Sequence, residues 1–284
     1  MKLNAFRVEF FESLKNFYEL EEVRGFYALL LQEKLGISRA EAVLQAESVL
    51  DASTEAAFKE ILKRLRNQEP IQYILNRTYF CDLLFVLHAN VLIPRPETEE
   101  LVYWIVSQYK NNPSKNLKIL DIGTGSGCIA ISLAKLLPNA TVSAMDISKK
   151  ALNTALENAQ NNQVQINFIE ADVLKTVSLE SSFDLIVSNP PYVLEVEKSK
   201  MQPNVLNFEP HQALFVTDAN PLIFYEKIAN LALRHLSKKG RLFFEINESY
   251  GSKIKNLLAE KGFSSIKLKT DFYGKNRMIS SGFH

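Results

Sequence analysis

A predicted strand, a glycine-rich turn and the start of a predicted helix follow one another in the run Lys118-Ile119-Leu120-Asp121-Ile122-Gly123-Thr124-Gly125-Ser126-Gly127. The apolar residues of 118–122 are typical of a buried strand, and a helix is expected over residues 127–137. Glycines permit a tight turn and a close approach of the backbone to a ligand. A helix N-terminus favours negative charge. The run therefore predicts one strand-loop-helix unit of an α/β fold, with a ligand at the loop.

Strands and helices alternate after this run. Further strands are expected over residues 141–146, 166–170, 183–188 and 241–246, and further helices over 148–160, 221–236 (capped by Asn220) and 250–261. Residues 266–269 and 277–280 are expected to close the sheet as an antiparallel pair. This alternation predicts a doubly wound, mostly parallel, seven-stranded sheet with helices on both faces.

The first part of the chain has a different pattern. Residues 1–75 keep apolar stripes at helical spacing, contain little glycine and have no proline before Pro70, which predicts a small N-terminal helical bundle domain. Ser38 and Glu41 are placed as a capping box for one of its helices. Alternating apolar residues over 79–93 predict a β-hairpin around His88-Ala89-Asn90. Residues 76–95 are therefore expected to link the bundle to a second domain over 96–284.

The composition excludes several classes of protein. The chain has 284 residues and a net charge of +1, so a large non-specific nucleic-acid surface is not expected. Cys81 and Cys128 are its only cysteines; they predict no metal site and no disulfide framework, which favours a cytoplasmic location. No apolar run approaches the roughly 20 residues that a membrane span requires, so no membrane partner is expected.

The stretch Ser188-Asn189-Pro190-Pro191-Tyr192 follows an expected buried strand, at the strand end where open α/β sheets bind ligands. Proline has no backbone N–H. The turn therefore offers two acceptors, the Asn189 side-chain oxygen and the Pro190 carbonyl, with the flat face of Tyr192 beside them. Such a site fits a planar –NH2 group, on a carboxamide or on a nucleobase. The simpler alternatives are a strand-ending turn residue for Asn189 and a core aromatic for Tyr192.

A nucleoside cofactor is the expected ligand of the glycine-rich loop. The Gly-x-Gly-x-Gly spacing of residues 123–127 differs from that of dinucleotide-binding loops, so Gly123, Thr124, Gly125, Ser126 and Gly127 are expected to hold the amino-acid end of another nucleoside ligand. Asp146 ends the second strand and suits two ribose hydroxyls. Asp172 and Val173 follow the third strand and suit an adenine edge and face. Alone, either aspartate is explained as a local cap; in this order, they suggest S-adenosylmethionine.

The motifs in this order resemble those of class I S-adenosylmethionine-dependent methyltransferases, which are Rossmann-like. The segments 69–75 and 91–99, together with Phe208-Glu209-Pro210 and Phe244-Glu245-Ile246, resemble the peptide chain release factor glutamine methyltransferase family over nearly the whole chain. The resemblance implies methyl transfer to the amide nitrogen of the glutamine in the Gly-Gly-Gln loop of release factors. Asn189, Pro190 and Tyr192 would be catalytic, Asn189 would also contact the cofactor, and these residues with Pro191 would bind substrate. Residues 1–75 would dock the release factor.

Some residues depart from the family pattern or leave alternatives open. Asn76 and the pair Cys81-Asp82 stand where the family usually has glycine. Arg95 is expected either to contact the substrate loop or to pair with an acid, and Glu97 and Thr98 to begin a helix rather than to touch ligand. The alternative functions are a ribosomal-protein glutamine methyltransferase, a nucleobase amino-group N-methyltransferase, or a non-catalytic adaptor that binds S-adenosylmethionine or RNA. A nucleobase enzyme needs a basic groove, which the balanced charge does not favour.

Overall fold

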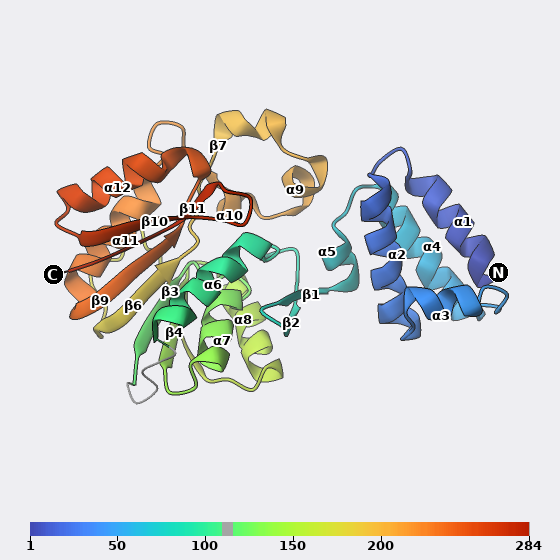
Figure 1. Ribbon diagram of the computed structural model, residues 1–284, viewed down its shortest axis with the longest axis horizontal. Coiled ribbons are helices and arrows are strands. Elements are labelled where there is room, and N and C mark those ends of the chain that lie inside the picture. The colour runs from blue at the N-terminus through green and yellow to red at the C-terminus, as the bar shows by residue number, and fades with distance from the viewer. Residues whose placement is uncertain (110–115, 284) are drawn as a thin grey trace. The chain divides into compact units, whose positions relative to one another are not determined.

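The computed structural model describes residues 1–109 and 116–283 (Figure 1). The chain forms two compact units. The first comprises Met1–Asn76 and Gln202–Phe208, and the second comprises Arg77–Met201 and Glu209–His284. Within the described residues, no helix is both long enough and apolar enough to cross a membrane.

The first unit is helical, as predicted. Its helices are α1 (Leu3–Leu14), α2 (Leu20–Leu35), α3 (Arg39–Leu44), α4 (Ala52–Arg66), α5 (Ile71–Leu75) and α9 (Pro203–Phe208). Aromatic side chains fill its core: the rings of Phe6 and Phe58 lie 4.7 Å apart, and Phe10 packs beside them. Burial of such rings is the main term that stabilises a small bundle.

Side-chain caps fix where two of these helices begin. The Ser38 hydroxyl accepts the Glu41 backbone N–H at 3.2 Å, and a Glu41 carboxylate oxygen accepts the Ser38 N–H at 2.7 Å. This reciprocal pair is the predicted capping box, which satisfies N–H groups that a helix start leaves without partners. Asp51 caps α4 by accepting the Thr54 N–H at 2.8 Å.

The hairpin lies at a different place from the predicted one. Strands β1 (Arg77–Phe80) and β2 (Leu83–Val86) pair antiparallel, and the turn is Cys81-Asp82, with φ of 48° and 60°. The prediction of a turn at 88–90 is wrong because the alternation of Val91 and Ile93 reflects burial of these side chains rather than pairing of a strand. A two-residue turn with both φ values positive matches the twist of the paired strands.

The second unit is built on the predicted seven-stranded sheet. Its strands, in spatial order, are β10 (Ser264–Thr270), β11 (Asn276–Gly282), β9 (Leu236–Glu245), β6 (Phe183–Ser188), β3 (Lys118–Ile122), β4 (Thr141–Asp146) and β5 (Ile166–Glu170). The pairs from β9 to β5 are parallel, while β11 is antiparallel to β9 and β10. The sheet is therefore mostly parallel, with the closing antiparallel pair where it was expected.

Helices cover both faces of this sheet (Figure 1). They are α6 (Pro96–Tyr109), α7 (Cys128–Leu136) and α8 (Lys149–Asn161) on one face, and α11 (Ile223–His235) and α12 (Gly251–Glu260) on the other. Neighbouring strand residues alternate between the two cores: Ile119 packs towards α7, and Leu120 packs towards α11. Asn220 does not cap α11, which begins after Leu222 without a side-chain cap.

Short elements connect the strand ends. They are β7 (Val193–Leu194), η1 (Glu195–Lys200), α10 (His211–Leu214), β8 (Phe215–Val216) and η2 (Glu248–Tyr250). The strand order reverses at β3: the chain runs outwards through β4 and β5 and then returns to the other side of β3 with β6. Open α/β sheets bind ligands outside the carboxyl ends of the strands at such a reversal.

Candidate active site

A cavity of about 220 Å³ lies at the carboxyl ends of the central strands. Its walls include Gly123 and Gly125 after β3, Asp146 at the end of β4, and Asp172 after β5. The Asn-Pro-Pro segment after β6 closes another side. The topology thus brings to one cavity residues that lie far apart in the sequence, such as Gly123 and Asn189, which are 66 positions apart.

The glycine-rich loop presents its backbone to the cavity. Gly123 and Gly125 have φ of +73° and +55°, and a Cβ added at either would meet no atom within 4 Å. Gly127 is different, because an added Cβ would lie 2.8 Å from Ile131 Cδ1 and 3.1 Å from Ala155 Cβ. The first two glycines leave the loop open towards a ligand, whereas Gly127 allows α7 to pack closely against α8.

The other predicted loop residues brace the loop instead of lining the cavity. The Thr124 hydroxyl donates to Asp121 Oδ2 at 2.6 Å, and the Ser126 carbonyl accepts Asn158 Nδ2 at 2.9 Å. Thr124, Ser126 and Gly127 are not among the residues that line the cavity. Complete burial raises the pKa of Asp121 to about 7. These buried polar contacts hold the backbone of the loop in place.

Asp146 links the loop to the next helix. Its carboxylate accepts the Gly125 N–H at 2.9 Å and the Ser148 N–H at 2.8 Å. The N-cap of α8 is Ser148, which accepts the Ala151 N–H at 3.2 Å. Burial raises the pKa of Asp146, although the backbone N–H bonds oppose this. Because a carboxylate has about four acceptor positions, Asp146 keeps acceptor capacity on the cavity wall.

Asp172 makes contacts with its sequence neighbours and also lines the cavity. Its Oδ1 accepts the Leu174 N–H at 2.9 Å, and its Oδ2 lies 3.3 Å from Lys175 Nζ. The same residue lines the cavity beside Val173 and Ile147. Ile147 is 45% exposed, which is unusual for an isoleucine and leaves an apolar surface at the mouth of the cavity.

The Asn-Pro-Pro-Tyr segment is anchored by the end of its strand. The Ser188 hydroxyl donates to the Ile122 carbonyl at 2.7 Å and so ties β6 to β3. Asn189, Pro190 and Pro191 line the cavity, but Tyr192 does not. The Tyr192 hydroxyl donates to Glu245 Oε1 at 3.0 Å, and burial followed by the Glu245 charge raises the pKa of this phenol.

A buried chain of hydrogen bonds orients the Asn189 amide. The Thr98 hydroxyl donates to Glu245 Oε2 at 2.6 Å, and Asn189 Nδ2 donates to Thr98 Oγ1 at 3.3 Å. A hydroxyl has only one proton to donate. Since that proton is used on Glu245, Thr98 can only accept from Asn189, and the Asn189 NH2 group must face Thr98. The Asn189 side-chain oxygen is thereby left as an acceptor on a residue that lines the cavity.

Sequence reasoning favoured a helix start over a ligand contact for Thr98, and it used Glu245 only as part of a family segment without assigning it a role. Thr98 begins α6, as predicted, and also joins this chain of hydrogen bonds. Glu245 is 1% exposed, and burial raises its pKa while the Thr98 and Tyr192 hydroxyls oppose the shift. The available signal was an acid within the otherwise apolar run 242–246, because acidic side chains are almost never fully buried unless they are paired.

Arg95 pairs with an acid, which was one of its two predicted positions. Its Nη2 lies 2.5 Å from Glu209 Oε1, and Glu209 Oε2 accepts the Ile93 N–H at 3.2 Å. Glu209 is 3% exposed. This pair ties the segment before α6 to the start of α10, where Pro210 and Ala213 are two further residues of the cavity wall.

The reversed strand order, the open glycine loop and the Asn-Pro-Pro-Tyr segment define a class I methyltransferase. The family described as "Methyltransferase small domain" matches residues 104–208, and the family described as "PrmC N-terminal domain" matches residues 12–75. A release factor glutamine methyltransferase of Flavobacterium psychrophilum is 48% identical over 284 residues, which is 100% of both chains. One of Bacteroides thetaiotaomicron is 42% identical over 95% of this chain and 96% of its own. The chain belongs to the release factor glutamine methyltransferase family.

Solved structures of other methyltransferases share the fold. The catalytic domain of hMettl16, in complex with an RNA hairpin, has a TM-score of 0.55 at 16% identity and covers 70% of this chain and 75% of its own. The 16S rRNA N2 G1207 methyltransferase of T. thermophilus has a TM-score of 0.51 at 18% identity, over 73% of this chain and 50% of its own. At these identities the likeness concerns the fold alone.

Proposed function

We propose that this protein transfers a methyl group from S-adenosylmethionine to the side-chain amide nitrogen of the glutamine in the Gly-Gly-Gln loop of peptide chain release factors. The observation that carries the proposal is the Asn189 amide, whose oxygen is left as an acceptor by Thr98 and Glu245. Membership of the release factor glutamine methyltransferase family supports a glutamine carboxamide, rather than a nucleobase, as the –NH2 group that this acceptor receives.

The chemistry of the residues that line the cavity suits S-adenosylmethionine. Gly123 and Gly125 offer an open backbone for the amino-acid end, and Asp146 has acceptor capacity for ribose hydroxyls. Ile147 and Val173 supply apolar surface for the adenine, with Asp172 at its edge. Thr124, Ser126 and Gly127 would hold the backbone of the loop in place without contacting the cofactor. Asn189 would lie next to the methyl group of the cofactor. When bound, S-adenosylmethionine supplies an electrophilic methyl group on a sulfonium.

The proposed chemistry follows from the acceptors. A carboxamide nitrogen is a poor nucleophile because its lone pair is delocalised into the carbonyl. The Asn189 oxygen and the Pro190 carbonyl accept hydrogen bonds from the two N–H groups of this nitrogen and hold it in place. Pro190 and Pro191 have no backbone N–H that could compete for these acceptors. Positioning of this kind contributes up to roughly 7–11 kcal/mol. The two oxygens would also stabilise the positive charge that develops on the nitrogen as its bond to the methyl group forms and the bond from sulfonium to methyl breaks; the nitrogen would then release one proton to solvent.

Hydrogen bonds with the surrounding residues orient the Asn189 acceptor. Thr98 and Glu245 act as positioning residues, since they set which way the Asn189 amide faces. Glu245 also holds the hydroxyl of Tyr192. Tyr192 does not line the cavity but packs against the core behind the Asn-Pro-Pro segment. We assign its ring to exclude water from that side of the bound amide, which strengthens the electrostatic contacts inside.

The first unit is proposed to dock the release factor. It has a hydrophobic core of its own and provides none of the residues that line the cofactor cavity. A unit of this kind is suited to recognition of a protein substrate, while the second unit performs the chemistry.

The test is mass spectrometry of an intact release factor after incubation with the enzyme and S-adenosylmethionine. We expect one added methyl group on the glutamine of the Gly-Gly-Gln loop. A release factor with glutamate at that position should not react, because a carboxylate has no nucleophilic nitrogen and would place its lone pairs against the two acceptors. Efficient methylation of bare RNA or DNA, with no reaction on the release factor, would reject the proposal.

A further inference from the structure

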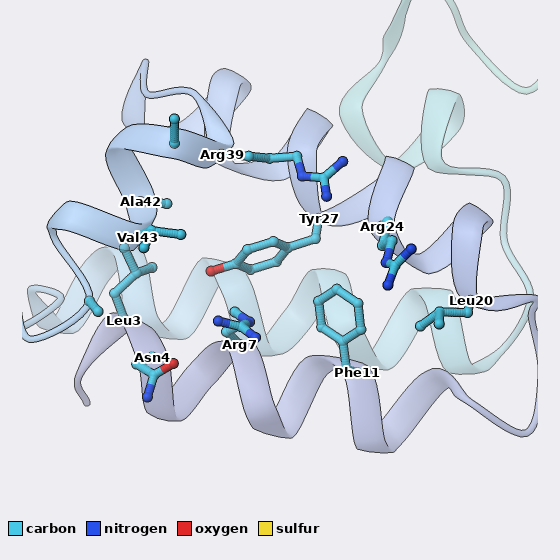
Figure 2. A pocket seen from close by; sticks show the side chains of 12 residues that line it. Leu3, Asn4, Arg7, Phe11, Leu20, Arg24, Tyr27, Arg39, Ala42 and Val43 are labelled. Atoms are coloured by element: carbon cyan, nitrogen blue, oxygen red, sulfur yellow. The ribbon is translucent and has the colours of Figure 1, made fainter.

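The first unit contains a second, larger cavity, of about 580 Å³, between α1, α2 and α3 (Figure 2). We call it the arginine pocket, because each of these three helices contributes one arginine to its wall: Arg7, Arg24 and Arg39. No aspartate or glutamate is among the residues that line it. Its volume lies within the range of small-molecule binding sites.

Most of the positive charge of the arginine pocket is uncompensated. Within residues 1–109 and 116–283, neither Arg7 nor Arg39 forms an ion pair. Arg24 pairs with Glu21, one turn earlier on the same helix, and the Glu21 side chain is 80% exposed. An exposed pair of this kind is weak, so an incoming carboxylate can compete with Glu21 for Arg24.

Tyr27 supplies an independent sign of a ligand site. The residue is only 6% exposed, and its hydroxyl has no hydrogen-bond partner in the part of the chain that the structure describes. Figure 2 shows its ring between Arg7 and Arg39, with the hydroxyl directed into the pocket. Burial raises the pKa of this phenol, although the charge of Arg7 opposes the shift, so Tyr27 remains a hydrogen-bond donor. The ring is thus buried while the hydroxyl oxygen stays accessible from the pocket, so it is free to bond a ligand there.

The remaining walls are apolar, which narrows the class of ligand. Phe11, Leu20 and Val43 line the arginine pocket beside the arginines, and Leu20 and Val43 are 54% and 66% exposed. A nucleic-acid backbone presents phosphates but no apolar group to such a wall, and a free phosphate is too small to fill the cavity. An acidic peptide segment that also carries an apolar side chain meets both kinds of wall.

We propose that the arginine pocket binds an acidic segment of the release factor, with carboxylates on Arg7, Arg39 and the Tyr27 hydroxyl and an apolar side chain against Phe11 and Leu20. This inference rests on the proposed function and names the place on the first unit at which the substrate docks. Charge complementarity of this kind sets binding specificity and the rate of association more than it affects a chemical step.

The test compares variants of the full-length enzyme, with an intact release factor and with a short Gly-Gly-Gln peptide as substrates. Calorimetry gives the Kd for the release factor, and steady-state kinetics give KM and kcat. The double variant Arg7→Ala/Arg39→Ala should raise Kd and KM for the intact release factor by about 5- to 30-fold. Tyr27→Phe, which keeps the ring, should raise them by roughly 3- to 10-fold. For both variants, kcat and the KM for the peptide should not change.

Arg66→Ala is the matched control, because Arg66 is an exposed arginine of the same unit that does not line the arginine pocket. Circular dichroism should show that all variants keep the helical content of the wild type. Equal Kd values for the pocket variants and Arg66→Ala would overturn the inference and leave the proposed function intact. If RNA, rather than the release factor, loses binding in the pocket variants, the inference is also overturned. Absence of methyl transfer by the wild type would reject the proposed function, while the Kd values would still decide the inference.

Discussion

The direction of one hydrogen bond decides what Asn189 offers to a ligand. An asparagine amide turned the other way would present two N–H groups to the cavity, and these would oppose the –NH2 group of a carboxamide. The carboxylate of Glu245 is the origin of the observed orientation, because it accepts from Thr98 and thereby makes Thr98 an acceptor for Asn189. A buried acid far along the chain thus sets the polarity of the site.

Removal of the Asn189 acceptor should affect the rate far more than cofactor binding. For Asn189→Ala we expect kcat to fall roughly 100- to 1000-fold, by analogy with loss of one preorganised polar contact. The Kd for S-adenosylmethionine, measured by calorimetry, should change little, because the glycine loop and Asp146 make the other proposed contacts. Turnover close to that of the wild type would reject the acceptor mechanism.

Glu245 should give the reaction an acidic limb in its pH dependence. Burial raises the pKa of Glu245 above its ordinary range. The ionised form accepts from both Thr98 and Tyr192, whereas the protonated form cannot, so kcat should decrease as the pH falls through this raised pKa. Glu245→Gln offers an NH2 group in place of one acceptor and lets the Asn189 amide turn. We expect kcat to fall about 10- to 100-fold.

The pH profile of Glu245→Gln separates this positioning role from a purely structural one. The variant should lose the acidic limb, while its thermal unfolding shows that the fold is kept. A second variant, Thr98→Val, interrupts the same chain of hydrogen bonds without a change of charge and should lower kcat in the same way. An acidic limb that persists unchanged in Glu245→Gln would show that another group titrates.

Asp146 should have the opposite profile to Asn189. A carboxylate that binds ribose hydroxyls contributes on the order of 1.5–3 kcal/mol per charged hydrogen bond. Asp146→Ala should therefore weaken S-adenosylmethionine binding in calorimetry, and saturating cofactor should restore part of the rate. The substitution also removes the bonds to Gly125 and Ser148, so Asp146→Asn, which keeps one acceptor oxygen, is the control. Unchanged affinity in both variants would leave Asp146 as a local brace only.

At the scale of elements, the third glycine of the loop is a packing residue. Alanine at position 127 must adopt a φ of +82° and place its Cβ 2.8 Å from Ile131 and 3.1 Å from Ala155. A left-handed backbone costs an alanine about 1–2 kcal/mol, and overpacking costs about 1–3 kcal/mol. Gly127→Ala should therefore lower the free energy of unfolding by roughly 2–5 kcal/mol, measured by denaturant titration.

Alanine substitution of a second glycine is the control, because it should change the free energy of unfolding in the opposite direction. Gly25 lies within α2, with no atom within 4 Å of an added Cβ and without a positive φ. Gly25→Ala should raise stability by about 0.5–1 kcal/mol, because alanine loses less backbone entropy in a helix. Equal effects of the two substitutions would mean that the contacts of α7 with α8 do not limit position 127.

The elements that the sequence predicted well are those whose own residues determine them. The buried strands 118–122 and 183–188 are apolar runs with clear ends, and the Ser38 capping box is a local pattern. The hairpin turn was misplaced for two reasons. The turn residues Cys81 and Asp82 have positive φ although neither is a glycine, and Val91 and Ile93 are buried at alternate positions without belonging to a strand.

The candidate site was predictable only where it follows the strand ends. Asp146, Asp172 and Asn189 come to one cavity because carboxyl ends of parallel strands share an edge. The contact of Thr98 with Glu245 joins residues 147 positions apart, and only the folded packing of α6 beside β9 brings them together. The closeness of α7 to α8, which makes Gly127 a packing residue, likewise depends on tertiary structure.

At the scale of the whole molecule, two hydrophobic cores belong to the second unit and a separate one belongs to the first. The cofactor cavity is lined only by residues of the second unit, and the arginine pocket only by residues of the first. Cores that share no residues are expected to fold with substantial independence. The division suggests that chemistry and recognition of the release factor are separable functions of the chain.

A variant that lacks residues 1–76 tests this division. It keeps every residue of the cofactor cavity and both cores of the second unit, so its Kd for S-adenosylmethionine and its kcat on a short Gly-Gly-Gln peptide should match those of the full chain. Its KM for an intact release factor should rise roughly tenfold or more, which corresponds to about 1.4 kcal/mol of lost binding energy. A thermal melt of the cofactor-bound variant checks that the second unit is folded. An unchanged KM for the intact release factor would show that the first unit does not dock the substrate, whereas loss of activity on the peptide as well would show that the chemistry depends on it.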